Sequence, residues 1–167
     1  MTHDVHRHPV DLDEASFLRD LEFRFERRRG PGGQHRNKVE TAVVARHRPT
    51  GIEAEAKRRR GQAENRRAAV RQLRLELALR VRIPQRAASF PSPVWERYRT
   101  PHGIRVAASN DDFPRVVAEW FDCWAAHDWR LDRAAEQLRV TTGQMLRFLR
   151  RHKRVYQMYE RLRRGGT

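Results

Sequence analysis

Residues 21–26 read Leu-Glu-Phe-Arg-Phe-Glu, with apolar and charged side chains in strict alternation. Successive side chains of a β-strand point to opposite faces, so this pattern predicts a half-buried strand. Strand-like sequence returns at 41–47, and Pro49-Thr50-Gly51 supplies turn residues before a second alternating run at 52–57. Together these segments predict a small antiparallel sheet whose last two strands form a hairpin.

The hydrophobic period changes from that of a strand to that of a helix after Gly61. This change predicts a helix that ends before Pro84, because proline cannot continue a helix interior. The helix carries two stripes, an apolar one at Val70, Leu73 and Leu77 and a basic one at Arg67, Arg71 and Arg74.

The rest of the chain is helical in character. Residues 84–109 contain four prolines and predict a linker. Residues 110–167 predict a small all-helical domain, with a first helix capped by Asn110 or Asp111 and a core that includes Trp120, Phe121, Cys123 and Trp124. The expected fold is α+β, with a flexible arm at 1–14, a sheet-and-helix domain at 15–83, the linker and the helical domain.

A helix-turn-helix-like pair is predicted near the C-terminus. Thr141 followed by Gln144 is a capping-box pattern, which places the start of the second helix there. We expect that helix to carry the basic residues Arg147, Arg150, Arg151, Lys153 and Arg154. Two interpretations remain open, a DNA reader and a structural helical pair whose arginines contact phosphate or solvent.

The net charge favours an anionic partner. The 167 residues include 36 Lys and Arg against 21 Asp and Glu, a formal charge of +15. Such an excess is typical of nucleic-acid-binding proteins, and we expect RNA. The single Cys123 excludes an internal disulfide, and the histidines at 3, 6 and 8 lack further ligands, so we expect no metal and no cofactor. Without a long apolar run or a signal peptide, we expect a cytoplasmic protein that does not bind membranes.

The loop between the first two predicted strands carries the motif Gly30-Pro31-Gly32-Gly33-Gln34. A Gly-Gly-Gln tripeptide alone is weak evidence of function. Here, however, it is followed by a predicted return strand, a hairpin and a basic helix. That arrangement, over 17–82, resembles the catalytic domain of class I peptide-chain release factors. The Gly-Pro-Gly-Gly-Gln form is most similar to the small codon-independent ribosome-rescue members of that family.

The resemblance implies hydrolysis of the ester between a nascent peptide and tRNA in the ribosomal peptidyl-transferase centre. Gly32 and Gly33 would permit a close backbone approach that a Cβ forbids. The backbone N–H of Gln34 would stabilise the charge that develops on the reacting ester, an effect of about 3–4 kcal/mol in oxyanion-hole precedents. Its side-chain amide would orient water. The motif contains no carboxylate–His pair, and the resemblance requires no general base from the protein.

The resemblance also assigns supporting residues. Gly30, Pro31, Asn37 and Thr41 would shape the loop. The ribosome, through large-subunit rRNA and peptidyl-tRNA, would be the partner of a monomer, and a glutamine N-methyltransferase would act on Gln34. RNA contacts are expected from the loop and the basic helix, at Arg28, Arg29, His35, Arg36, Lys38, Arg58, Arg59, Arg60, Arg66, Arg67, Arg71 and Arg74, and from the C-terminal basic residues.

Two departures from the family pattern affect this hypothesis. Few residues precede the resemblance and 88–167 contain no recognisable decoding tripeptide, so we expect no stop-codon reading. A helical region stands where rescue factors have a short basic tail, and Arg28 and Arg29 replace the usual small residues. The alternative hypothesis is a non-catalytic ribosome- or nucleic-acid-binding protein that uses the helix-turn-helix-like region.

Overall fold

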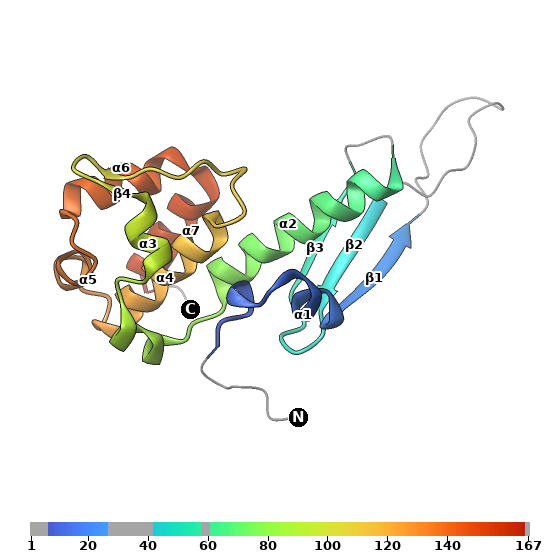
Figure 1. Cartoon of the computed structure of the whole chain (residues 1–167), viewed down its shortest axis with the longest axis horizontal. Helices are drawn as coiled ribbons and strands as arrows, with labels where there is room; N and C mark the ends of the chain where they lie inside the picture. Colours follow the sequence, from blue (N-terminus) through green and yellow to red (C-terminus); the bar gives the residue numbers. More distant parts are fainter. Residues whose placement is uncertain (1–6, 27–41, 58–60, 166–167) are drawn as a thin grey trace. The chain divides into compact units, whose positions relative to one another are not determined.

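The structure is a computed structural model that describes residues 7–26, 42–57 and 61–165 (Figure 1). The chain divides into two compact units. We call Leu12–Leu77 the sheet unit, and Met1–Asp11 together with Ala78–Thr167 the helical unit. A small antiparallel sheet combined with many helices confirms the expected α+β class.

The sheet unit contains the predicted strands and the predicted helix. α1 (Glu14–Arg19) precedes three antiparallel strands in the order β1 (Leu21–Glu26), β2 (Ala42–His47) and β3 (Glu53–Ala56), and α2 (Gln62–Arg80) begins after them. The β2–β3 turn places Gly51 at φ +69°, a left-handed conformation that glycine adopts without strain. The predicted hairpin and its turn residues are thus confirmed.

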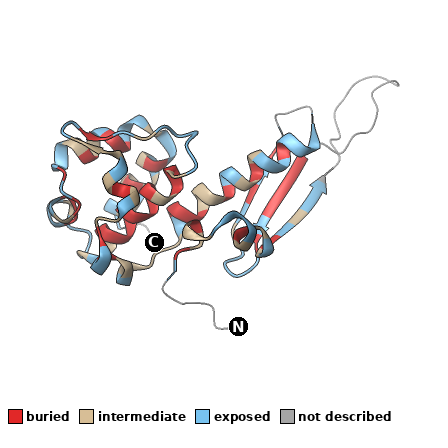
Figure 2. Cartoon of the chain, in the orientation of Figure 1, coloured by how far each residue is buried: buried red, intermediate tan, exposed pale blue. Residues whose placement is uncertain are grey.

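One face of the sheet and one stripe of α2 form the core of this unit (Figure 2). Paired residues such as Val43 and Ala56, or Ala45 and Ala54, are buried on that face. The opposite face carries charged side chains, with Arg24 Nη2 at 2.8 Å from a carboxylate oxygen of Glu53. Within the sheet unit the buried α2 side chains recur every four residues, at Asn65, Ala69, Leu73 and Leu77.

Arg74 lies against the core instead of projecting freely from α2. Its guanidinium carbon is 4.0 Å from the centroid of the Phe17 ring, and its Nη1 donates to the carbonyl of Leu12 at 3.4 Å. Phe17 is fully buried and stacks on the ring of His47, with 6.0 Å between the ring centroids. The aliphatic part of an arginine also covers apolar surface, so this contact stabilises the sheet unit.

We predict that Arg74→Ala lowers the unfolding free energy by about 1–3 kcal/mol, because it removes a cation–π contact and a charge-assisted hydrogen bond. The matched control is Arg71→Ala, which deletes the same charge from an exposed position one turn earlier and is expected to cost less than about 0.5 kcal/mol. Urea unfolding followed by circular dichroism measures both. Equal losses in the two variants would contradict a structural role for Arg74.

The helical unit surrounds α4 (Phe113–Ala126). Trp120, Phe121, Cys123 and Trp124 are buried, which confirms the predicted core. The other elements are η1 (Pro9–Asp11), η2 (Pro84–Ser89), α3 (Pro93–Tyr98), the hairpin of β4 (Arg99–Thr100) and β5 (Gly103–Ile104), α5 (Leu131–Gln137), α6 (Thr142–Arg151) and α7 (Lys153–Arg163).

Residues 84–109 differ from the expected linker because they are an integral part of the helical unit. Trp95 is fully buried, and its Nε1 donates to the carbonyl of Leu138 at 3.0 Å. Pro84 and Pro93 stand in the first turns of η2 and α3, where a missing N–H costs nothing. The prolines begin short helices here.

The start of the chain and the start of α4 also differ from expectation. His8 and Val10 are buried, so the described part of the predicted flexible arm at 1–14 is packed. The N-cap of α4 is Asp112, and its side chain makes no capping bond. The Asp112 carboxylate instead accepts from Arg97 Nη1 at 2.8 Å and from the Tyr98 hydroxyl at 3.0 Å.

Two carboxylates of α4 are buried in the helical unit and satisfied there. Glu119 accepts from the backbone N–H of Ser92 at 2.7 Å and from its hydroxyl, at the N-terminus of α3. Asp122 accepts from the N–H of Ile83 at 2.8 Å and from Arg86 Nη1 at 2.6 Å. Burial raises the pKa of both carboxyls above their ordinary values, because it disfavours the charged form.

We predict that Glu119→Gln becomes more stable relative to the wild type as the pH rises. A carboxyl whose pKa is raised on folding stabilises the protein at low pH, and that contribution is lost as the pH rises from the ordinary value of 4.5 through the raised pKa. The amide does not titrate, so the difference in unfolding free energy should shift in favour of the Glu119→Gln variant between about pH 4 and pH 7. Thermal unfolding across this pH range measures the stability difference, with Glu136→Gln at an exposed position as the control. A stability difference that does not change with pH would refute the prediction.

Candidate functional site

The predicted catalytic loop lies outside the described residues. This applies to the catalytic Gly32, Gly33 and Gln34 and to the loop-shaping Gly30, Pro31, Asn37 and Thr41. It also applies to part of the predicted RNA-binding set, namely Arg28, Arg29, His35, Arg36, Lys38, Arg58, Arg59 and Arg60.

The structure does describe the frame to which these segments are attached. Glu26, the last residue of β1, pairs with Ala42, the first residue of β2, and Val43 pairs with Ala56 at the end of β3. Paired residues of antiparallel strands lie about 4.5–5.5 Å apart between Cα atoms. Segments 27–41 and 58–60 therefore both leave the sheet at the same end.

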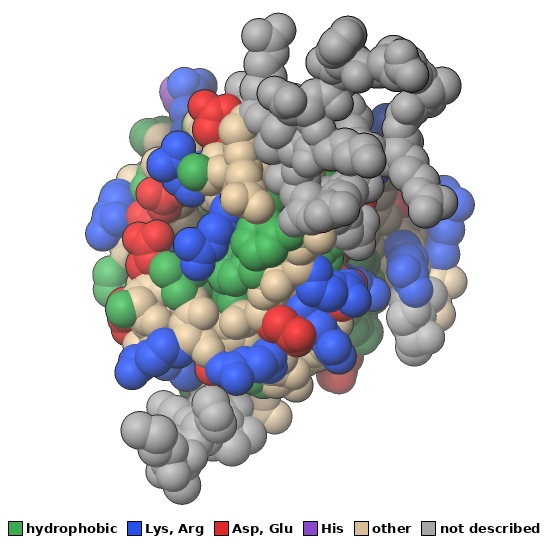
Figure 3. All heavy atoms as spheres, turned by 90° about the vertical axis from the view of Figure 1, so that its right-hand side faces the viewer, with side chains coloured by type: hydrophobic (Ala, Val, Ile, Leu, Met, Phe, Trp, Pro, Cys, Tyr) green, Lys and Arg blue, Asp and Glu red, His purple; other side chains and the backbone are tan. Residues whose placement is uncertain are grey.

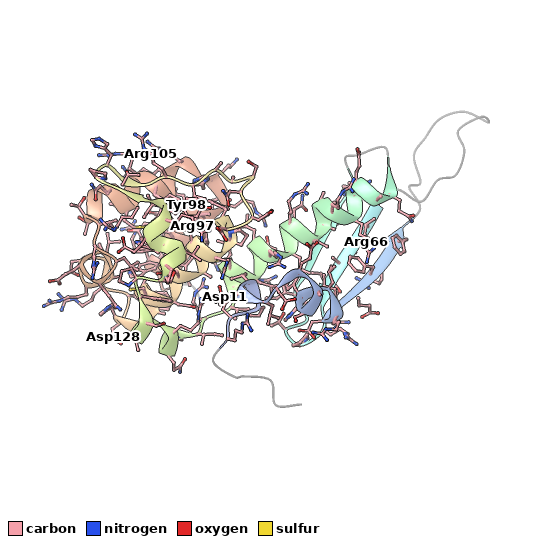
Figure 4. All side chains as sticks on the ribbon, in the orientation of Figure 1. Asp11, Arg66, Arg97, Tyr98, Arg105 and Asp128 are labelled. Atoms are coloured by element: carbon pink, nitrogen blue, oxygen red, sulfur yellow. The ribbon has the colours of Figure 1, made fainter. Side chains whose placement is uncertain are left out.

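α2 presents a second part of the predicted interface. Arg66, Arg67 and Arg71 are exposed on this helix, and the Arg66 guanidinium lies 4.4 Å from the centroid of the Phe23 ring (Figure 4). Phe25, two residues along β1, has an exposed fraction of 44%. On the face shown in Figure 3, Lys and Arg side chains lie among acidic and apolar ones. Arg74, predicted with this group, is instead half-buried against Phe17.

The C-terminal basic residues lie on two helices, not on one as expected. Arg147, Arg150 and Arg151 belong to α6, whereas Lys153 and Arg154 belong to α7, and all are exposed. The break is at His152, whose φ of −121° and ψ of 91° are not helical. Its ring packs at 4.6 Å from the Phe113 centroid and 5.1 Å from that of Phe148, so core packing ends α6 here.

The predicted helix-turn-helix-like pair is formed by α5 and α6. Its capping box is confirmed, with Gln144 N–H donating to Thr141 Oγ1 at 3.1 Å and Thr141 N–H to Gln144 Oε1 at 2.9 Å. Arg139 adopts φ +55° in the intervening turn. The Gln144 amide also donates to the carbonyl of Pro101 at 2.9 Å, which fastens the β4–β5 hairpin to the first turn of α6. Nothing in the sequence indicated this contact.

Among the described residues, little supports a reactive thiol or a metal site. Cys123 is buried and burial raises the pKa of its thiol to about 12, so it is not a thiolate nucleophile at neutral pH. Within the described ranges no cluster of His, Cys, Asp and Glu is arranged to hold a metal ion. No helix in those ranges has the length and apolar character needed to cross a membrane.

The comparisons with known proteins match the sheet unit and its surroundings. Residues 14–92 match the model of the RF-1 domain. Peptide chain release factor 2 of Buchnera aphidicola is 46% identical over 77 residues, which are 44% of this chain and 21% of that protein. Peptide chain release factor 2 of Thermomicrobium roseum is 38% identical over 90 residues, 51% of this chain and 24% of that protein.

A mitochondrial relative extends the same pattern. Peptide chain release factor 1 of Bos taurus is 39% identical over 70 residues, 42% of this chain and 16% of that protein. The chain therefore spans a quarter or less of the length of these relatives. The matched region includes the Gly32-Gly33-Gln34 loop, the three strands and α2. Residues 14–92 are thus similar to the RF-1 domain, and this part of the chain is similar to peptide chain release factors.

Proposed function

We propose that the protein is a codon-independent release factor that hydrolyses the ester of peptidyl-tRNA on stalled ribosomes. The observation that carries the proposal is the Gly32-Gly33-Gln34 motif inside a matched RF-1 domain. The motif lies in 27–41, a segment whose two attachments to the sheet, Glu26 and Ala42, are paired across neighbouring strands. A loop held at both ends in this way suits insertion into a confined site.

The proposed reaction needs few protein groups. A water oxygen attacks the ester carbonyl carbon, the bond to the tRNA ribose oxygen breaks, and a proton passes to that oxygen. The backbone N–H of Gln34 donates to the developing charge, and the Gln34 amide orients the attacking water. Gly32 and Gly33 let the backbone approach the ester closely. No general base from the protein is assigned, because the ribosome and the tRNA hydroxyl surround the reacting atoms.

Basic side chains support the ribosome as partner. Arg67 and Arg71 are exposed on α2, and Arg147, Arg150 and Arg151 are exposed on α6. Arginine forks suit phosphate, and RNA supplies phosphate at high density. We assign these residues to rRNA or tRNA contacts and propose that the protein acts in the cytoplasm as a monomer.

The folded helical unit supports the proposal that peptide release does not depend on a codon. The RF-1 match ends at residue 92, and the residues after it form α3 to α7 around a tryptophan-rich core. We propose that this unit binds ribosomal RNA and thereby positions the catalytic loop without reading a stop codon.

Peptide release from ribosomes stalled on an mRNA without a stop codon tests hydrolysis directly. We predict that Gly33→Ala reduces the release rate by about 10²–10³-fold while ribosome binding persists, because the added Cβ displaces the Gln34 N–H donor. The matched control is Gly61→Ala, whose Cβ would meet only Glu64 Cγ at 3.8 Å and should release normally. Equal release with a sense codon and with a stop codon in the A site is expected.

The same assay decides between this proposal and the alternative. The capping box and the exposed arginines of the α5–α6 pair favour a non-catalytic ribosome- or nucleic-acid-binding role as the second candidate. Tight ribosome binding without release by the wild type would support that role and refute hydrolysis of this substrate.

We further propose that Gln34 is a substrate for a glutamine N-methyltransferase. Co-expression with such an enzyme should add one methyl group to the peptide that contains Gln34, as read by mass spectrometry. Gln34→Asn, which retracts the amide by one methylene, serves as control and should remain unmodified. An unmodified wild-type peptide would contradict this assignment.

A further inference from the structure

The acidic side chains of the helical unit neutralise one set of its arginines. Carboxylates form ion pairs with arginines on α3, on α5 and directly before α5. Glu160 on α7 forms ion pairs with two arginines. The distances between charged atoms range from 2.8 to 3.4 Å for Arg97–Asp112, Arg130–Asp132, Arg133–Glu136, Arg163–Glu160 and Arg164–Glu160. These arginines keep little net charge for an external anion.

A second set is left uncompensated. In the part of the chain that the structure describes, Arg105, Arg147 and Arg151 form no ion pair with a carboxylate, although all three are exposed. Arg105 follows β5 directly, and the other two lie on α6. These three arginines therefore place uncompensated positive charge on α6 and at the end of the β4–β5 hairpin, where Figure 4 labels Arg105.

A groove of about 470 Å³ lies within this region. Ile104, Val106 and Phe148 supply apolar lining, and Arg105, Arg151 and His152 supply polar lining. None of the residues that line it is acidic. Its volume falls in the range of small-molecule sites, ~300–1,000 Å³.

We propose that this groove binds an unstacked nucleotide of a single-stranded RNA. Proteins bind single-stranded RNA through bases that stack on arginine planes or aromatic side chains, while arginine forks bind the flanking phosphates. Arg105 and Arg151 provide two such planes from separate elements, and the apolar lining accepts the base between them. Arg147, one turn before Arg151 on α6, extends the basic surface along the strand.

The geometry disfavours a DNA duplex as the ligand. A helix-turn-helix reader inserts the first turn of its second helix into the major groove. Here that turn is fastened to the hairpin by the hydrogen bond from Gln144 to Pro101. A Cβ on Gly103 would lie 3.0 Å from Gln144 Cβ, so the hairpin backbone is in direct contact with the helix. The groove lies at the other end of α6, where Phe148 and Arg151 line it.

This inference rests on the proposed function, in which the helical unit binds RNA, and deepens it by naming the groove and the single-stranded ligand; it requires no hydrolysis. The test uses the full chain without ribosomes, so loss of peptide release and loss of RNA binding are separate results. Fluorescence anisotropy with a labelled oligouridine is the binding measurement. We expect Arg105→Ala/Arg151→Ala to weaken binding about tenfold. The matched double variant Arg130→Ala/Arg133→Ala deletes the same charge from paired positions and should change binding less than about twofold.

A second pair of variants tests the groove without removing an arginine. Ala107 lines the groove and is exposed, whereas its exposed neighbour Ala108 does not line it. Ala107→Glu should weaken RNA binding by repulsion of phosphate, and Ala108→Glu, with the same charge, should weaken it less. Thermal unfolding by circular dichroism verifies that each variant is folded.

Crosslinking locates the bound RNA independently. Oligonucleotides that contain 4-thiouridine should crosslink to 104–107 or 148–152, as mapped by mass spectrometry. Crosslinks confined to Leu12–Leu77, equal losses in the two double variants, or stronger displacement of the RNA by duplex DNA than by unlabelled RNA would each overturn the assignment.

Discussion

The register of β1 against β2 places Leu21 opposite His47 and Glu26 opposite Ala42. A slip of one residue would turn every side chain of β1 to the other face of the sheet, exposing Leu21 and Phe23 and burying charged residues. The hydrophobic pattern therefore fixes the register, and the register fixes where segment 27–41 leaves and re-enters the sheet. The strand ends that flank the motif are thus set by backbone pairing.

Some arginines of this protein stabilise its fold, and others keep their charge at the surface. The net charge alone does not distinguish these two purposes. Arg82 is an example of the first, since it donates to carbonyls at the end of α2 and lies 4.5 Å from the Phe121 centroid. Its burial lowers the pKa of the guanidinium to about 10. Arg86 joins Asp11 and Asp122 in the same unit. Arginines such as Arg105 and Arg151 serve the second purpose, because they keep their charge at the surface.

Local patterns predicted the local structure well. The alternation at 21–26 predicted β1, and the Thr141–Gln144 spacing predicted the capping box, since both depend on neighbouring residues only. Pro84 and Pro93 were wrongly interpreted as linker residues. The sequence alone does not distinguish a proline that breaks a helix from one that begins a helix.

Long-range packing was the part that could not be predicted. The break at His152 depends on Phe113, far away in the chain, and the packing of Arg74 depends on Phe17. The hydrogen bond from Gln144 to Pro101 joins residues 43 positions apart, so local sequence patterns could not predict it. For the predicted catalytic loop the motif itself was the informative signal, and the structure contributes the strand ends that flank it.

Cys123 has a practical consequence for studying this protein. It is the single cysteine of the chain, it is fully buried, and its Sγ donates towards the carbonyl of Ala134. Maleimides and other alkylating probes react with accessible thiolates, so the folded protein should resist them without mutagenesis. A cysteine introduced at any exposed position would then accept one fluorophore or spin label at a known place. The native chain is in this sense already a background for site-specific labelling.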